Sequence, residues 1–156
     1  MNLLIDAKNS DIIVKNQWRK KMRVIAVDYG DARTGIAVSD ITGFLVGRAY
    51  TVTEWNREKV IDAILSEVEN SKAERIVLGY PKNMNGTIGP RGEKSEELKK
   101  LLEERTDIPV ILWDERRTTV DADRILRESG KKGKNKRNII DAVAASLILE
   151  GYLQTL

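Results

Sequence analysis

The sequence predicts one α/β domain built on a mixed five-stranded sheet with helices on both faces. Five short runs of apolar, largely β-branched residues are spaced along the chain. After the third run they alternate with segments whose apolar residues recur at the period of a helix. Only short turns separate the first three runs, which predicts an antiparallel meander. The expected order of elements is therefore β-β-β-α-β-α-β-α-α.

The first half of the chain supplies the meander. Val24–Val27 is almost wholly apolar and ends at Asp28, which is typical of a central strand buried on both faces. The turn residues Tyr29–Asp31 lead into a second strand at Thr34–Ser39, which we expect to pair with the first as a hairpin. The third strand is expected over Leu45–Val52.

The second half alternates helices and strands. An apolar stripe between Val60 and Val68 predicts a helix, and Arg75–Gly79 predicts the fourth strand. The Gly- and Pro-rich stretch Tyr80–Gly92 is expected to be a loop. A helix over Glu93–Glu104 and a fifth strand over Pro109–Trp113 follow, with Trp113 packed in the core.

Two helices are expected to close the chain. Thr118–Asp121 resembles a capping box that opens a helix ending at Gly130. After a basic loop, Asn138 is expected to cap a last helix that is almost wholly apolar and therefore buried against the sheet. This start places Asp141 three residues after the cap, in the first helical turn.

Composition excludes whole classes of chemistry. The 156 residues contain no cysteine and no histidine, which rules out disulfides, thiolate or imidazole metal sites and Ser-His-Asp triads. Catalysis must use carboxylates, hydroxyls, amines or a hard metal held by oxygen. No apolar run is long enough to span a membrane, and Asp6 follows Leu3–Ile5 too closely for a signal peptide. We therefore expect a cytoplasmic protein without membrane contacts.

Positive charge is concentrated in two segments. Residues 1–21 hold five cations and two acids, which account for the whole formal net charge of +3. These residues show no hydrophobic period, so we expect an N-terminal extension, disordered or artificially added, with Met22 beginning a domain of residues 22–156. The other segment, residues 131–137, contains five cations and no acid.

Acidic residues occur where predicted elements end or begin. Asp28 follows the first strand, Asp114 and Glu115 follow the fifth, and Asp141 opens the last helix. Carboxylates that converge at the carboxyl edge of an α/β sheet can hold Mg²⁺ or Mn²⁺. Each acid also has a structural explanation: Asp28 as a turn residue, Asp141 as a partner of the helix dipole, and the pair as a solvated cluster beside Arg116 and Arg117.

Four ordered motifs raise the functional interpretation above these alternatives. They are Asp28-Tyr29-Gly30-Asp31-Ala32-Arg33-Thr34-Gly35, the Gly79-Tyr80-Pro81 to Gly89-Pro90-Arg91 segment, Asp114-Glu115-Arg116-Arg117-Thr118-Thr119 and Asn138-Ile139-Ile140-Asp141-Ala142-Val143-Ala144-Ala145. From Met22 to the C-terminus the chain closely resembles the YqgF (RuvX) family, which is similar to Holliday junction resolvases and has an RNase H-like fold.

The resemblance implies a metal-dependent endonuclease that trims precursor 16S ribosomal RNA near its 5′ end during ribosome biogenesis. An activity on branched DNA is the alternative. Carried over by position, the catalytic carboxylates are Asp28, Asp114, Glu115 and Asp141, and Asp28, Glu115 and Asp141 form the metal-ligand set. Which member of the Asp114-Glu115 pair coordinates the metal stays open. Resolvases take one acid from the fourth strand, but here that strand ends in Gly79-Tyr80-Pro81, so the fifth-strand pair must substitute for it.

Basic residues complete the expected site. Four arginines lie beside the proposed ligands within the motifs and are expected to bind the nucleic-acid backbone. They are Arg33, Arg91, Arg116 and Arg117. The basic segment is expected to meet phosphates through Lys131, Lys132, Lys134, Lys136 and Arg137. The expected partner is precursor 16S ribosomal RNA or branched DNA, bound by a monomer or a homodimer.

Two rival functions compete with the nuclease. Asp28-x-Gly30 also resembles the phosphate-binding hairpin of actin-like and sugar-kinase ATPases, but those enzymes need two such domains around a nucleotide. A nucleic-acid-binding module without cleavage is the other rival, and the retained acids argue against it.

Overall fold

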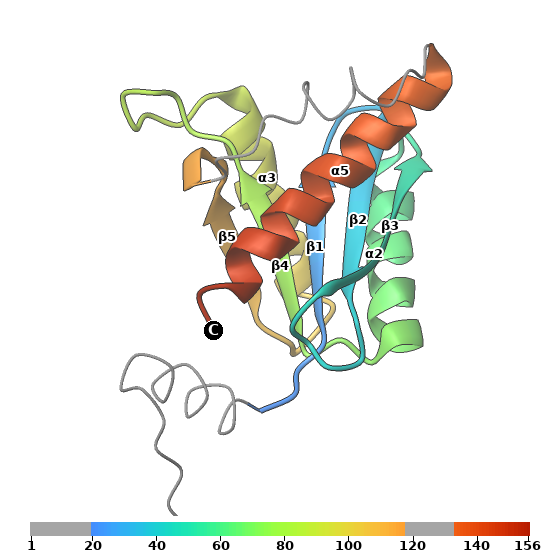
Figure 1. Ribbon diagram of the computed structural model, residues 1–156. Coiled ribbons are helices and arrows are strands. Elements are labelled where there is room, and N and C mark those ends of the chain that lie inside the picture. Colours follow the sequence, from blue (N-terminus) through green and yellow to red (C-terminus); the bar gives the residue numbers. More distant parts are fainter. Residues whose placement is uncertain (1–19, 118–132) are drawn as a thin grey trace, which may run out of the picture.

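The computed structural model describes residues 20–117 and 133–156 (Figure 1). The elements in these ranges are β1 (Val24–Tyr29), β2 (Arg33–Ser39), β3 (Val46–Thr53), α2 (Arg57–Ser71), β4 (Arg75–Tyr80), α3 (Pro90–Glu103), β5 (Val110–Asp114), the short 3₁₀ helix η1 (Glu115–Arg117) and α5 (Lys134–Leu153). The expected helix at Thr118–Gly130 lies outside the described residues.

The five strands form one mixed sheet in the order β3-β2-β1-β4-β5. The β1–β2 and β2–β3 pairs are antiparallel, which confirms the predicted meander. The β1–β4 and β4–β5 pairs are parallel. Because these three strands point the same way, β1, β4 and β5 all end at one edge of the sheet, and β1 lies at its centre as predicted.

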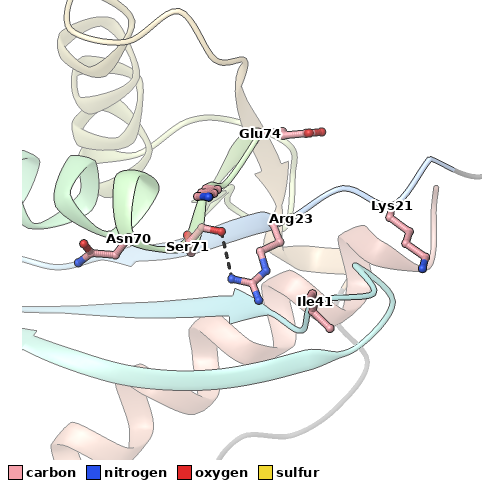
Figure 2. A pocket seen from close by; sticks show the side chains of 7 residues that line it. Lys21, Arg23, Ile41, Asn70, Ser71 and Glu74 are labelled. Carbon is pink, nitrogen blue, oxygen red and sulfur yellow. Dashed lines mark hydrogen bonds between the residues drawn. The ribbon is translucent and has the colours of Figure 1, made fainter.

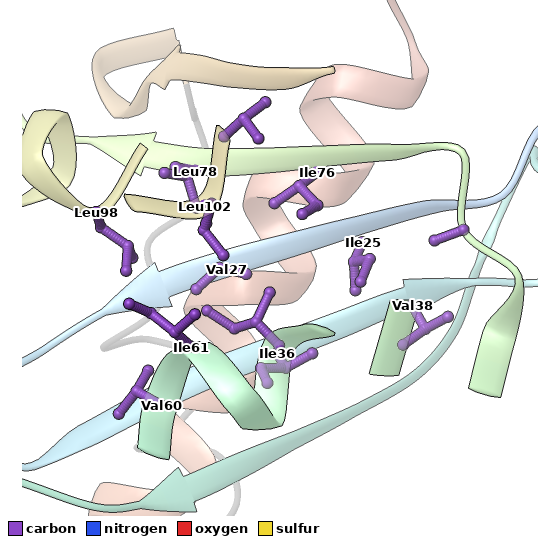
Figure 3. Packing of buried hydrophobic residues seen from close by; sticks show 13 residues of the cluster. Ile25, Val27, Ile36, Val38, Val60, Ile61, Ile76, Leu78, Leu98 and Leu102 are labelled. Carbon is purple, nitrogen blue, oxygen red and sulfur yellow. The ribbon is translucent and has the colours of Figure 1, made fainter. Parts of the chain in front are cut away.

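Helices cover both faces of the sheet, as the sequence predicted. Alternate residues of β1 point to opposite faces: Ile25 and Val27 pack with α2 and α3, whereas Val24 and Ala26 pack with α5. Figure 3 shows the first of these two cores, in which side chains from four strands meet those of α2 and α3. In Figure 1 the helix α5 runs diagonally across the other face. Trp113 is buried on this α5 face, as expected.

Two helix starts differ from the prediction. α3 begins at Pro90 rather than Glu93, because a proline at the first helical position has its missing N–H where no partner is needed. α5 begins at Lys134, with Gly133 as the N-cap at a φ of 74°. The prediction that Asn138 caps this helix is therefore wrong. Lysine and arginine are good helix formers, so residues 134–137 extend the helix although cations are disfavoured at its N-terminus.

Within the described parts of the chain, none of the helices is both long and apolar enough to cross a membrane.

Candidate active site at the carboxyl edge of the sheet

Three acids from three elements lie at the edge where β1, β4 and β5 end. Asp28 is the second-last residue of β1, and Glu115 follows β5 directly. Asp141 lies on α5 where the helix crosses β2. The charge of Asp141 acts on Asp28, and the charge of Asp28 acts on Glu115. The structure thus brings residues that are up to 113 positions apart in the sequence into one electrostatic group.

Glu115 reaches the end of β4 because that strand ends in glycine. A Cβ atom placed on Gly79 would collide with Oε1 of Glu115. The carboxylate of Glu115 therefore occupies the space that a side chain at position 79 would need. The sequence showed that β4 carries no acid at its end, and the structure shows that Glu115, the residue directly after β5, lies there instead. Gly79 was not singled out as a site residue; the signal in the sequence was a glycine, rather than an acid, near the end of the fourth strand.

Asp141 is held by two contacts with β2. A Cβ on Gly35 would overlap the main-chain oxygen of Asp141, so the helix backbone lies directly on this strand. The Nε of Arg33 donates to Oδ2 of Asp141 at 2.9 Å. Because α5 begins at Lys134, Asp141 lies in the third turn of the helix rather than the first. The helix dipole acts within the first turn, so it does not explain an acid at this position.

Burial gives two of the acids unusual pKa values. Burial raises the pKa of Asp28 to about 6, with Asp141 adding to the rise and Arg91 opposing it. Burial likewise raises the pKa of Glu115 to about 7, with Asp28 and Asp114 adding and Arg91 opposing. In both groups burial is the main cause, because it removes the water that stabilises the charged carboxylate. A cluster of acids with such shifts is a common mark of a functional site.

Asp114 differs from its neighbour Glu115. The guanidinium of Arg116 donates to both carboxylate oxygens of Asp114, at distances between 2.8 and 3.2 Å. This bond holds the pKa of Asp114 down at about 2. Arg116 also donates to the main-chain oxygen of Asn83 at 3.4 Å. Asp114 thereby holds Arg116, which also contacts the loop after β4, whereas the carboxylate of Glu115 lies over Gly79 and is affected by the charge of Asp28.

A divalent cation fits the chemistry of this site. Among residues 20–117 and 133–156, no three acids already stand together in an arrangement that holds a metal. The donors are nevertheless hard carboxylate oxygens, which Mg²⁺ and Mn²⁺ prefer. The space over Gly79 admits the Glu115 carboxylate, and burial leaves the charged forms of Asp28 and Glu115 poorly solvated, which a bound cation would offset. Asp28 and Glu115 are the available pair, and Asp141 is bound to Arg33.

Cations surround the acids. An amino group of Arg91 lies 3.9 Å from Oδ1 of Asp28, and two thirds of the Arg91 side chain is exposed. Arg91 and Lys82 also line a hollow of about 330 Å³ between the loop after β4 and the start of α3. The loop itself is built as a hairpin, in which the Asn83 N–H donates to the Thr87 oxygen at 2.9 Å.

The predicted basic loop is in part helical. Lys134, Lys136 and Arg137 belong to the first turn of α5, so their assignment to a loop is wrong, and Arg137 is exposed there. The backbone of Arg117 ends η1. Lys131 and Lys132 lie outside the described residues. The described cations thus frame the carboxyl edge of the sheet from α3, from η1 and from the start of α5.

A second hollow, of about 380 Å³, lies at the opposite end of the sheet (Figure 2). Arg23 and Glu74 are among the residues that line it. Arg23 donates to the main-chain oxygen of Ser71 at 3.0 Å. Glu74 already pairs with Lys20 at 3.3 Å. This hollow contains a single acid, so it lacks the acidic cluster that distinguishes the carboxyl edge.

Comparisons with known proteins show which proteins this chain is similar to. Residues 22–155 match the family model described as "RuvX: Holliday junction resolvase". The "Putative pre-16S rRNA nuclease" of Acetivibrio thermocellus is 45% identical over 137 residues, which cover 86% of this chain and 96% of that protein. The protein of the same name from Halothermothrix orenii is 40% identical over 132 residues, with coverages of 85% and 94%.

The likeness extends to solved structures. RuvC of T. thermophilus, in complex with a Holliday junction substrate, has a TM-score of 0.57 at 11% identity, with 86% of this chain and 96% of that chain covered. At this identity the comparison concerns the fold alone. It confirms the resolvase-like, RNase H-like fold that the sequence predicted.

Proposed function

This chain belongs to the RuvX family, and from that premise we propose that it is a metal-dependent endonuclease that processes the 5′ end of precursor 16S ribosomal RNA. The observation that carries the proposal is the group formed by Asp28, Glu115 and Asp141, in which two buried carboxylates have pKa values raised to about 6 and 7. The two relatives described above, which bear the name of a pre-16S rRNA nuclease, are 40% and 45% identical to this chain over most of its length.

The acids are the residues that would hold the metal. Asp28 and Glu115 provide the first oxygen donors, and Asp141 provides the third. A bound Mg²⁺ or Mn²⁺ supplies the positive charge that activates water and stabilises the transition state of phosphodiester cleavage. Asp28 is largely buried and pairs with Arg91, so this carboxylate has little contact with bulk water. A histidine is not required for this reaction.

The cations would position the nucleic-acid backbone. Arg91 lies over Asp28 and is exposed enough to take a phosphate next to the scissile bond. Lys136 and Arg137 lie at the N-terminus of α5, where the helix dipole also attracts anions. Together with Lys131, Lys132 and Lys134, they would extend the contact along the strand that is cut. Arg116 and Arg117 would bind the backbone on the other side, beside β5.

A second candidate is cleavage of four-way DNA junctions. The description of the matching family favours it. The same carboxylates would cut either substrate, because the chemistry acts on the phosphodiester and not on the base or sugar.

The two candidates are separated by one cleavage experiment. Purified protein is incubated with precursor 16S RNA and with a four-way junction, in Mg²⁺, in Mn²⁺ and in a chelator. We expect metal-dependent cuts near the 5′ end of the RNA that leave a 5′-phosphate, and their loss in Glu115→Gln. Glu74→Gln is the matched control, because Glu74 lines the hollow at the far end of the sheet.

The other outcomes have definite meanings. Cleavage of the junction in preference to the RNA would identify a resolvase. Binding of either substrate without any cleavage would identify a nucleic-acid-binding module and refute the nuclease.

A further inference from the structure

One ion pair in the candidate site ties a proposed metal ligand to a proposed substrate contact. Arg33 opens β2 and Asp141 lies on α5, 108 positions later, and their Nε and Oδ2 atoms are 2.9 Å apart. One third of the Arg33 side chain is exposed, compared with 18% of the Asp141 side chain. Solvent and ligands therefore reach the guanidinium more easily than the carboxylate.

The backbones on both sides of this ion pair are fixed. Arg33 and Gly35 are two residues apart on β2, so they belong to the same face of the sheet. Gly35 contacts the main-chain oxygen of Asp141 so closely that no Cβ fits between them. The carboxylate of Asp141 can therefore change partner only by a rotation of its own side chain, without movement of the helix.

Arg33 and a metal compete for the same carboxylate. Asp141 accepts from Arg33 through Oδ2, an oxygen that would otherwise be available to a cation. A guanidinium binds a phosphate at least as well as a carboxylate, with two parallel hydrogen bonds. A phosphate near β2 would therefore draw Arg33 away and free Asp141.

We propose that Arg33 is a positioning residue that holds Asp141 away from the metal until a phosphate of the nucleic acid takes its guanidinium. This inference rests on the proposed function, because it takes Asp141 as the third metal ligand. Nucleic acid and metal then strengthen each other's binding by the same factor, as thermodynamic linkage requires. The complete metal site forms only when there is a backbone to cut.

The direct test measures Mn²⁺ binding by calorimetry, with and without a short, fully phosphorothioate single-stranded RNA that resists cleavage. In the wild-type protein we expect the RNA to tighten Mn²⁺ binding by about tenfold, within the usual range of coupling between sites. In Arg33→Gln, Mn²⁺ should bind about fivefold to tenfold more tightly without RNA, and the RNA should add little.

Two further variants separate the ion pair from a simple loss of charge. In the Asp141→Asn background, Arg33→Gln should no longer change the affinity for Mn²⁺. Arg91→Gln removes the same charge beside Asp28 without touching Asp141, so its effect should persist in that background. Thermal melts check that every variant is folded. If Arg33→Gln is not folded, Arg33→Lys replaces it, and its affinity for Mn²⁺ should change in the same direction but by less.

Different results would overturn different conclusions. If Arg33→Gln binds Mn²⁺ no more tightly than the wild type, or if its effect survives in Asp141→Asn, the role of Arg33 is refuted and the proposed nuclease stands. If the wild-type protein takes up no Mn²⁺ even with RNA, the metal-dependent function itself fails.

Discussion

Glu115 and Asp114 are adjacent in the sequence but have opposite electrostatic surroundings. Burial and the charge of Asp28 raise the pKa of Glu115 to about 7, whereas Arg116 lowers the pKa of Asp114 to about 2. Asp114 is the last residue of β5 and Glu115 is the first residue of η1, so the backbone changes conformation between the two acids and their side chains have different partners. Of the two acids, Glu115 is therefore the better proposed metal ligand, and Asp114 is the residue that orients Arg116.

The raised pKa values predict how stability depends on pH. The folded state holds protons on Asp28 and Glu115 at pH values where the unfolded chain has lost them. Their contribution to the free energy of unfolding is full below about pH 4 and is lost as the pH rises through 6 and 7. The loss is at most about 1.4 kcal/mol per pH unit for each group. The chain has no histidine that would titrate in the same range.

Thermal melts in a chelator between pH 5 and 8 measure this effect. We expect the melting temperature to fall with rising pH in the wild type and to change much less in Glu115→Gln. Mn²⁺ should reverse the trend, because the metal binds the deprotonated acids. A pH profile that is identical in the wild type and in Glu115→Gln would contradict the assigned pKa of Glu115.

Asp141→Asn tests the third acid. Cleavage of precursor RNA should fall by on the order of a hundredfold or more, because an amide replaces a charged metal ligand. Nucleic-acid binding should persist. Single-turnover cleavage and a binding titration measure the two effects. Asp62→Asn is the matched control, since Asp62 also pairs with an arginine, Arg105 at 2.6 Å, but lies on the exposed side of α2. A wild-type cleavage rate in Asp141→Asn would remove Asp141 from the site.

The candidate acids could be predicted from the sequence, but the contacts that each acid makes could not. Strand ends and motif order were enough to select Asp28, the Asp114-Glu115 pair and Asp141. The sequence could not choose between Asp114 and Glu115, because that choice depends on Arg116 and on the space over Gly79. It also could not pair Arg33 with Asp141, since the two residues meet only when α5 packs on β2.

At the scale of the elements, the packing contact between α5 and β2 positions Asp141. The start of α5 was predicted five residues too late, because the basic run at its start resembles a solvated loop more than a helical turn. The strands were predicted to within about two residues, since apolar β-branched runs are a strong local signal. Helix starts depend on caps and on packing, which local patterns describe less well.

Gly35→Ala tests this contact. The added methyl group would collide with the main chain of α5, so the helix must move away from β2 and carry Asp141 with it. We expect a loss of about 1–3 kcal/mol in the free energy of unfolding, together with a large loss of cleavage. Gly89→Ala is the matched control, because its new Cβ would lie 3.7 Å from the side chain of Asn83, which is an ordinary van der Waals contact.

Urea unfolding and cleavage assays on both variants make the comparison. Gly89→Ala should lose less stability than Gly35→Ala. Equal stability and equal activity in the wild type and Gly35→Ala would show that α5 does not bear on β2 at this point.

At the scale of the whole molecule, the location of the positive charges matters more than the net charge. Beyond residue 21 the formal charges cancel, yet cations collect around the carboxyl edge of the sheet. The affinity for nucleic acid should therefore depend on a few basic segments and on salt, rather than on the net charge of +3.

Replacement of Lys131, Lys132, Lys134 and Lys136 by alanine tests the basic segment. The slope of log affinity against log salt should become shallower by a few units, at about 0.7 per phosphate contact on a single strand and about 0.9 on a duplex. Filter binding across a salt series measures the slope. The control replaces four lysines remote from the site, namely Lys21, Lys72, Lys99 and Lys100. If both sets change the slope equally, residues 131–136 have no special role.

The extension of residues 1–21 is predicted to be dispensable. Its deletion removes a charge of +3, so binding at low salt should weaken slightly, while cleavage at saturating substrate should continue. Circular dichroism and a cleavage assay on the shortened chain, beginning at Met22, measure both. Loss of the folded state would contradict this domain boundary.

The position of α5 in the chain has a consequence for synthesis. This helix follows every strand in the sequence, and it alone among the described helices covers the face formed by Val24, Ala26, Ala37 and Val77. A nascent chain therefore leaves that face uncovered by α5 until translation has passed residue 153, and it lacks Asp141 until translation has reached residue 141. Asp28 and Glu115 by themselves leave the proposed metal site one ligand short. Under the proposed function, the site is thus completed only after every strand has been synthesised.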